Sequence, residues 1–157
     1  VAKQTGFSEE YIREAEQKPT GSFLYDLYAS VQPTSVPDQV FIAQAKVIRE
    51  AAEKGSCVIV GRCADYVLQD RCPCVNIFVH APLEKRMERA VTRYGLKGDD
   101  VQGALLKTDK RRATYYNYYT GRKFGDARNY TLSLDSLSIG IENAVEVVAR
   151  YVESWQG

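Results

Sequence analysis

Apolar residues follow one another in three stretches in the way that β-strands require. They run continuously over 57–61, dominate 75–81 and alternate with polar residues over 130–135, which predicts three strands. Apolar residues at helical spacing predict helices between and around these strands. The predicted helices span about 8–18, 21–28, 38–54, 64–68, 83–94, 100–119 and 138–155. Helices that alternate with buried strands indicate an α/β fold.

The predicted helices have recognisable ends and faces. Asp38, the pair Asp99–Asp100 and Ser138 each stand where an N-cap is needed. The helix after Pro82 has an apolar stripe of Leu83, Met87, Ala90, Val91 and Tyr94. The last helix has a predicted core face of Ile141, Val145, Val148, Val152 and Trp155.

The first predicted strand ends in a feature that points to a ligand. Cys57 to Val60 are apolar, Gly61 follows, and Arg62 comes directly after the glycine. In an open α/β sheet, ligands bind at the carboxyl ends of the strands, where a glycine lets the backbone turn. The sequence therefore predicts that Arg62 lies at a ligand-binding edge.

Two basic clusters are candidates for anion binding. Arg86, Arg89 and Arg93 recur on one face of the helix that follows the second strand. Together these three arginines would suit a polyanionic ligand, but a solvated helix face on which they pair with Glu84 and Glu88 fits the spacing equally well. The run 107–112 holds four cations in six residues, and it either binds phosphates or is simply solvated. Its cations are Lys107, Lys110, Arg111 and Arg112.

Composition sets limits on partners and compartment. The 157 residues carry a net charge of +1 and 45% hydrophobic residues, which fits one globular domain and argues for neither nucleic acid nor membrane as a partner. No apolar run approaches the roughly 20 residues that span a bilayer, and the first residues lack a signal-peptide core, so we expect a cytoplasmic protein. The four cysteines favour reduced thiols over a zinc site, and no residue is assigned to a metal.

The order of these features resembles the cytidylate kinase-like family of P-loop nucleoside monophosphate kinases. The resemblance covers essentially the whole chain. It is carried by the segments GRCADYVL at 61–68, KTDKRRATYYNYYTG at 107–121 and GDARNY at 125–130. It implies a single three-layer domain over 1–157, with a mainly parallel sheet flanked by helices and a basic lid at about 95–125.

The resemblance also implies a reaction and its residues. Such enzymes transfer the γ-phosphoryl group of ATP, with Mg²⁺, to a nucleoside monophosphate such as CMP or dCMP. The partners would be nucleoside mono- and triphosphates, while the acceptor base and a homo-oligomeric state stay open. Carried over by position, the substrate-binding residues are Arg62, Asp65, Arg86 and Arg89. The lid residues assigned to catalysis are Lys107, Lys110, Arg111 and Arg112.

One element of the family pattern is absent from the sequence. The family begins with a strand and a glycine-rich phosphate loop, but no GxxxxGK[ST] motif and no Gly-Lys pair occurs here. In the family that strand lies between those corresponding to 57–61 and 75–81. Three explanations stay open: the loop belongs to a longer polypeptide, another segment or subunit fills the gap, or the remaining strands pair directly.

Two functions from different classes therefore remain. The first is a kinase-like phosphotransferase, inactive as these 157 residues if the loop is missing. The second is a non-catalytic relative that binds a nucleotide or phosphate, or acts through protein contacts. A further option within the enzyme class is a small-molecule kinase of the same fold with a different acceptor. The tyrosines at 115–119 are expected to pack within the lid, although an interface is the alternative.

Overall fold

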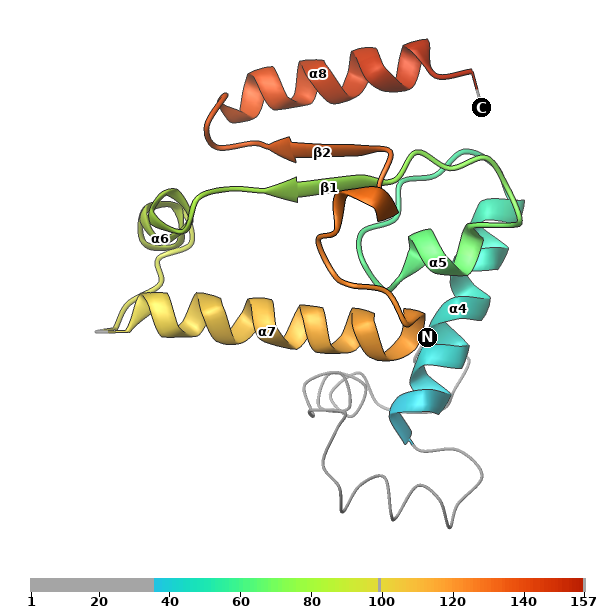
Figure 1. The fold of residues 1–157 in the computed structure, drawn as a ribbon, viewed down its shortest axis with the longest axis horizontal. Coiled ribbons are helices and arrows are strands. Elements are labelled where there is room, and N and C mark those ends of the chain that lie inside the picture. Colours follow the sequence, from blue (N-terminus) through green and yellow to red (C-terminus); the bar gives the residue numbers. More distant parts are fainter. Residues whose placement is uncertain (1–35, 99, 157) are drawn as a thin grey trace. The chain divides into compact units, whose positions relative to one another are not determined.

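A computed structural model describes residues 36–98 and 100–156 (Figure 1). The sheet strands and helices follow one another in the order α4 (Val36–Glu53), α5 (Ala64–Leu68), β1 (Ile77–His80), α6 (Leu83–Thr92), α7 (Val101–Thr120), the 3₁₀ turn η1 (Ala127–Asn129), β2 (Leu132–Asp135) and α8 (Ile141–Ser154). The helices predicted at 8–18 and 21–28 lie outside the described residues. Within the described ranges, the helices are too short or too polar to cross a membrane.

The described residues belong to two compact units. The first holds 36–72 and 114–122, and the second holds 73–98, 100–113 and 123–156. Helix α7 begins in the second unit and ends in the first. The chain is therefore α/β in class, and the sequence-based prediction of a single domain stays a prediction.

Helix α4 forms the core of the first unit. It begins at Val36, two residues before the predicted cap, because Pro37 suits the first turn of a helix. Its buried residues are Val40, Gln44, Ala45 and Ile48. The ring of Phe41 stacks on Tyr119 at a centroid distance of 4.1 Å, so the end of α7 packs on this helix. Helix α5 has the predicted bounds.

The predicted strand at 57–61 is wrong. These residues carry no ladder in the structure, and the side chains of Val58 and Val60 are 95% and 89% exposed. A strand is stabilised by hydrogen bonds to a neighbouring strand, and the described residues supply no such neighbour here. An apolar, β-branched sequence alone does not make this segment a strand.

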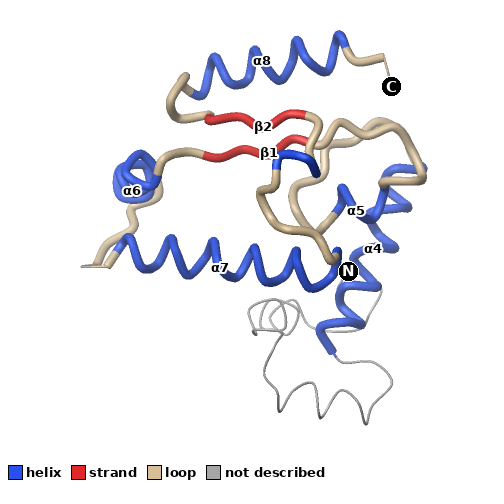
Figure 2. Tube along the Cα trace, viewed as in Figure 1, coloured by secondary structure: helices blue, strands red, loops and turns tan. Residues whose placement is uncertain are grey.

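The second and third predicted strands form the sheet of the second unit (Figure 2). Strands β1 and β2 are parallel, with Ile77 opposite Leu132 and His80 opposite Asp135. Both are shorter than predicted. Because the strands are parallel, His80 and Asp135 end at the same edge of the sheet.

Phe78 of β1 is the centre of an aromatic cluster. Its ring lies 4.8 Å from that of Tyr130 and 5.3 Å from that of Phe124. Gly125 has a φ of +74°, and a Cβ there would come within 3.2 Å of the Phe78 ring. The loop before β2 therefore needs a glycine both for its backbone and for this close approach.

The ends of the later helices confirm one predicted cap and correct another. Asp100 Oδ1 accepts a hydrogen bond from Gly103 N at 2.7 Å, which caps α7 as predicted. Ser138 does not cap α8. The cap position is held by Gly140 with a φ of +86°, and Ser138 lies in the turn before it.

The apolar faces of α6 and α8 are only partly covered. In α8 the shielded residues include Ile141, Ala144 and Val148, whereas the predicted core residues Val145 and Val152 are exposed. In α6 Ala90 is buried, but the predicted stripe residue Val91 is exposed, as is Tyr94 beyond the end of the helix. A sheet with two strands in the described part of the chain offers little apolar surface, so a full helical stripe is not buried.

Candidate functional site

The turn at 61–63 has an uncommon backbone. Gly61, Arg62 and Cys63 have φ angles of 72°, 58° and 54°, all in the left-handed region. Glycine adopts this region freely, but arginine and cysteine do so at a cost, which is typical of functional turns. Ala64 N donates to the Gly61 carbonyl at 3.1 Å and closes the turn. The turn leaves Arg62 exposed at the start of α5.

The residue three positions after Arg62 is held by helix α7. Tyr116 of α7 is 5% exposed, and its hydroxyl donates to Asp65 Oδ2 at 2.6 Å. Cys63, which lies between Arg62 and Asp65 in the sequence, is buried. Burial, reinforced by the negative charge of Asp65 and opposed by Arg62, raises the pKa of the Cys63 thiol to about 12. Asp65 is therefore fixed in orientation, while Cys63 is an inert core thiol.

The tyrosines of α7 pack on α4 within the first unit. Tyr115 donates to Gln44 Oε1 at 3.0 Å, and Tyr119 donates to Asp38 Oδ1 at 3.3 Å. Burial, with the nearby Asp38 carboxylate, raises the pKa of Tyr119 well above its ordinary value. These tyrosines pack, as the sequence favoured, but they do so on α4 and not within the predicted lid region.

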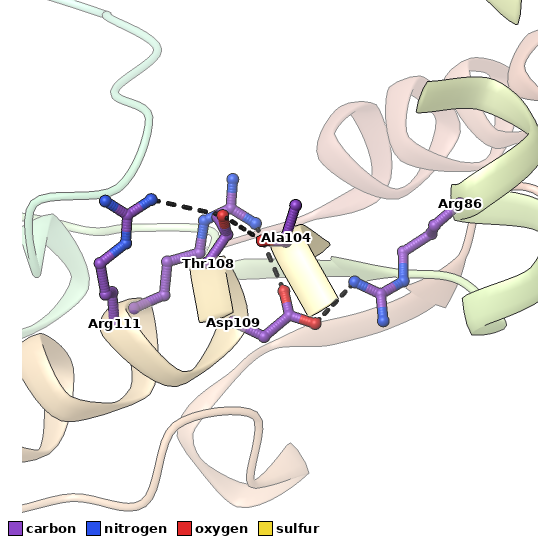
Figure 3. Close-up of polar contacts among 6 residues, drawn as sticks. Arg86, Ala104, Thr108, Asp109 and Arg111 are labelled. Atoms are coloured by element: carbon purple, nitrogen blue, oxygen red, sulfur yellow. Dashed lines mark hydrogen bonds and ion pairs between the residues drawn. The ribbon is translucent and has the colours of Figure 1, made fainter. Parts of the chain in front are cut away.

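In the second unit, one aspartate pairs with an arginine from each of the two basic clusters. Arg86 of α6 donates from Nη1 to Asp109 Oδ2 of α7 at 2.7 Å (Figure 3). Arg112, one turn further along α7, lies 3.7 Å from the other oxygen of Asp109. The Arg86 side chain is 29% exposed and Arg112 is 65% exposed. Arg86 is thus paired with α7 and is not a solvated residue paired along its own helix.

Of the remaining cations of the predicted site, Arg89 is half-buried, whereas Lys107, Lys110 and Arg111 are exposed. Arg89 lies with its guanidinium carbon 5.6 Å from the centre of the Tyr94 ring, a cation–π distance. Arg111 Nη2 donates to Thr108 Oγ1 at 3.3 Å, and Thr108 donates in turn to the Ala104 carbonyl (Figure 3). Lys107 and Lys110 are exposed on α7.

The eight predicted site residues therefore fall in two groups. The first unit holds Arg62 and Asp65, and the second holds Arg86, Arg89, Lys107, Lys110, Arg111 and Arg112. The structure connects Arg86 with Arg112 inside the second unit. That all eight act on one ligand stays a prediction.

Two participants were missed by the reasoning from sequence. Asp109 was passed over as the single acid in a basic run, although an acid three residues before Arg112 is a signal for pairing. Arg122 follows helix α7, lies 5.5 Å from the Tyr66 ring centre and donates to Gln69. No pattern in the sequence distinguishes Arg122 from an ordinary loop cation.

The shared edge of β1 and β2 holds a further polar group. Ser138 N donates to Asp135 Oδ1 at 3.1 Å, and Lys85 Nζ donates to Leu137 O and Ser138 Oγ, both at 3.3 Å. The hydrogen bonding of Ser138, with the charges of His80 and Lys85, holds the pKa of Asp135 below its ordinary value. These contacts fix the turn that leads into α8.

A cavity of about 550 Å³ lies beside the basic clusters but does not suit anions. It is lined by Met87, Glu88, Val91, Thr92, Asp100, Val101 and Gln102. Among the described residues that line it, the charged ones are the two acids Glu88 and Asp100. Across residues 36–98 and 100–156, no group of three or more His, Cys, Asp or Glu side chains is placed to hold a metal ion.

Comparison with known proteins gives three findings. The profile of the cytidylate kinase-like family matches residues 1–138. A cytidylate kinase from Methanopyrus kandleri is 30% identical over 96 residues, which are 56% of this chain and 50% of that protein, so the chain spans about half the length of the curated relative it matches. A crystal structure of an uncharacterized protein from Eubacterium ventriosum aligns with a TM-score of 0.72 at 26% identity, over 98% of this chain and 88% of the other.

Proposed function

The chain belongs to the cytidylate kinase-like family, and we propose that it binds a nucleoside monophosphate as the acceptor and lid portion of a phosphotransferase. The acceptor we propose is CMP or dCMP, with ATP as the donor. Family membership suggests a nucleotide kinase-like function in general, and the specific reaction is our proposal.

The observation that carries the proposal is the link between the two basic clusters. Asp109 joins Arg86 of α6 to the cationic segment of α7 within one compact unit. Arg86 uses Nη1 in this bond, and the guanidinium has further donors in a planar fork that matches phosphate geometry. A cationic surface built from two helices in this way suits a polyphosphate better than a single isolated cation does.

Each group of residues has a role in the proposed chemistry. Phosphoryl transfer requires mainly positioning and neutralisation of the charge that spreads over the phosphate oxygens. Arg62 would bind the acceptor phosphate from its constrained turn, with Asp65 orienting the nucleotide. Arg86 and Arg89 would contact phosphates from α6. The exposed lid cations Lys107, Lys110, Arg111 and Arg112 would close over the transferring group and exclude water.

The donor side of the reaction rests on the family alone. The 157 residues contain no glycine-rich phosphate loop to hold ATP. Mg²⁺ in such sites is usually held by one or two carboxylates together with the substrate phosphates. No residue of this chain is assigned to the metal.

A second candidate function follows from the same absence. A relative without a phosphate loop could bind nucleotides or phosphorylated ligands and perform no transfer. The two candidates share the acceptor residues and differ only in turnover, so one pair of assays separates them.

The test combines binding and turnover. A thermal-shift screen of CMP, dCMP, UMP and AMP should show the largest stabilisation with the cytidine nucleotides. Equal shifts for all four would remove the cytidine assignment. Incubation of the chain with ATP, Mg²⁺ and CMP should then be followed by ³¹P NMR for formation of CDP. Binding without CDP supports the non-catalytic candidate, and absence of any shift contradicts both.

A further inference from the structure

Asp109 is the single acid in a segment otherwise made of cations and one threonine, and its main partner is remote in sequence. In an isolated helix Arg112, three residues later, would be its natural partner. The structure places Arg112 at 3.7 Å and gives the 2.7 Å hydrogen bond to Arg86, on another helix (Figure 3). Asp109 thus serves a contact between helices and not only the local neutralisation of α7.

The pairing fixes a guanidinium that would otherwise have little to hold it. Arg86 Nε is buried and has no hydrogen-bond partner among the described residues. Its Nη1 bond to Asp109 is the polar contact that orients the planar group. The two side chains are 29% and 36% exposed, so solvent screens this pair less than it screens Arg112.

We propose that Asp109 is a positioning residue that holds Arg86 in a conformation ready to bind phosphate. This inference rests on the proposed function, because it assumes that Arg86 meets a phosphate of the nucleotide. Asp109 itself does not touch the ligand. The Asp109 carboxylate lowers the net positive charge of the site by one unit. It also restricts rotation of the Arg86 side chain, so less conformational entropy is lost when Arg86 binds phosphate.

If Asp109 competes with the ligand for Arg86, removal of Asp109 should change the anion affinity in the opposite direction. If Asp109 merely occupied Arg86 in competition with the ligand, its removal would free a cation and tighten anion binding. If Asp109 positions Arg86, its removal weakens binding although the net charge rises by one. The sign of the change therefore distinguishes the two.

The experiment measures CMP and inorganic tripolyphosphate binding by calorimetry in Asp109→Asn, Asp109→Ala and Asp109→Glu. We expect about a tenfold rise in Kd for the first two, the loss of roughly one oriented charged hydrogen bond. Asp109→Glu, which restores a carboxylate, should recover part of the affinity. Glu146→Gln on the exposed part of α8 changes the net charge equally and should leave Kd within about twofold. Equal or tighter binding by Asp109→Asn would overturn the proposal.

A second measurement needs no ligand. The Nε–H group of Arg86 should give a slowly exchanging ¹H–¹⁵N signal because Nε is buried, and loss of this signal in Arg86→Lys identifies it. The signal should disappear in Asp109→Asn and return in Asp109→Glu. An unchanged signal in Asp109→Asn overturns the positioning role. Loss of the signal in a chain that binds neither CMP nor tripolyphosphate refutes the proposed function and leaves the positioning contact supported.

Discussion

The backbone at Arg62 allows a test that separates conformation from ligand binding. Arg62 has a φ of 58° in a turn where both neighbours are also left-handed. We compare Arg62→Gly with Arg62→Ala. Both lose the guanidinium and every contact it makes, so the difference between them reports the backbone alone.

The magnitude follows from the left-handed conformation. A residue with a Cβ pays about 1–2 kcal/mol in this region, whereas glycine pays about 0.5–1 kcal/mol of additional chain entropy on folding. Arg62→Gly should therefore be more stable than Arg62→Ala by about 0.5–1 kcal/mol. For a chain of this length that difference raises Tm by about 1–4 °C.

The assay is thermal and urea unfolding of the two variants, with a matched pair at Lys46. Lys46 lies in the middle of α4 with its side chain 69% exposed, where glycine should be less stable than alanine by about 1 kcal/mol. The glycine–alanine order should thus reverse between the two positions. If alanine is the more stable residue at both, the argument from the turn fails. Both Arg62 variants should also lose CMP affinity.

Three further predictions concern the packing around the site. Tyr116→Phe should lower the free energy of unfolding in urea by about 1–2 kcal/mol, because it removes the hydrogen bond to the Asp65 carboxylate. Tyr118 is 49% exposed, and Tyr118→Phe should change the same free energy by less than about 0.5 kcal/mol. In the folded chain at pH 8, iodoacetamide should label exposed Cys57 readily and leave Cys63, buried with a pKa near 12, unlabelled; mass spectrometry showing equal labelling would contradict this. Asp100→Ala should cost about 1 kcal/mol through loss of the α7 cap and Asp100→Asn much less, as thermal unfolding can check; equal losses would show that the side-chain acceptor is not what stabilises this end.

The sequence predicts well the elements whose formation depends on residues close to one another along the chain. Helix α5 has its predicted bounds, and Asp100 caps α7, because helix periodicity and capping depend on residues three or four positions apart. Strands β1 and β2 were found from their apolar patterns, although their ends depend on pairing. Their parallel order came from the family resemblance and not from the residues themselves.

The wrong predictions concern segments whose structure depends on contacts with distant parts of the chain. Residues 57–61 have a strand-like sequence, but a strand forms only with a neighbour, and the described residues provide none. Val145 and Val152 continue the apolar period of α8, but only a sufficiently wide partner surface would bury them.

The candidate site shows the same division between local and non-local information. Arg86 and Arg112 were identified as residue types that suit phosphate. The role of Asp109 depends on a contact across 23 residues, which spacing along one helix cannot reveal.

We infer that cations that bind the phosphate carry most of the recognition, and calorimetric titration of the chain with CMP and, separately, with cytidine tests this inference. CMP should therefore bind saturably, with a Kd that rises with salt concentration, and cytidine should bind at least roughly tenfold more weakly. Equal binding of CMP and cytidine, or no binding of CMP by the folded chain, would contradict it.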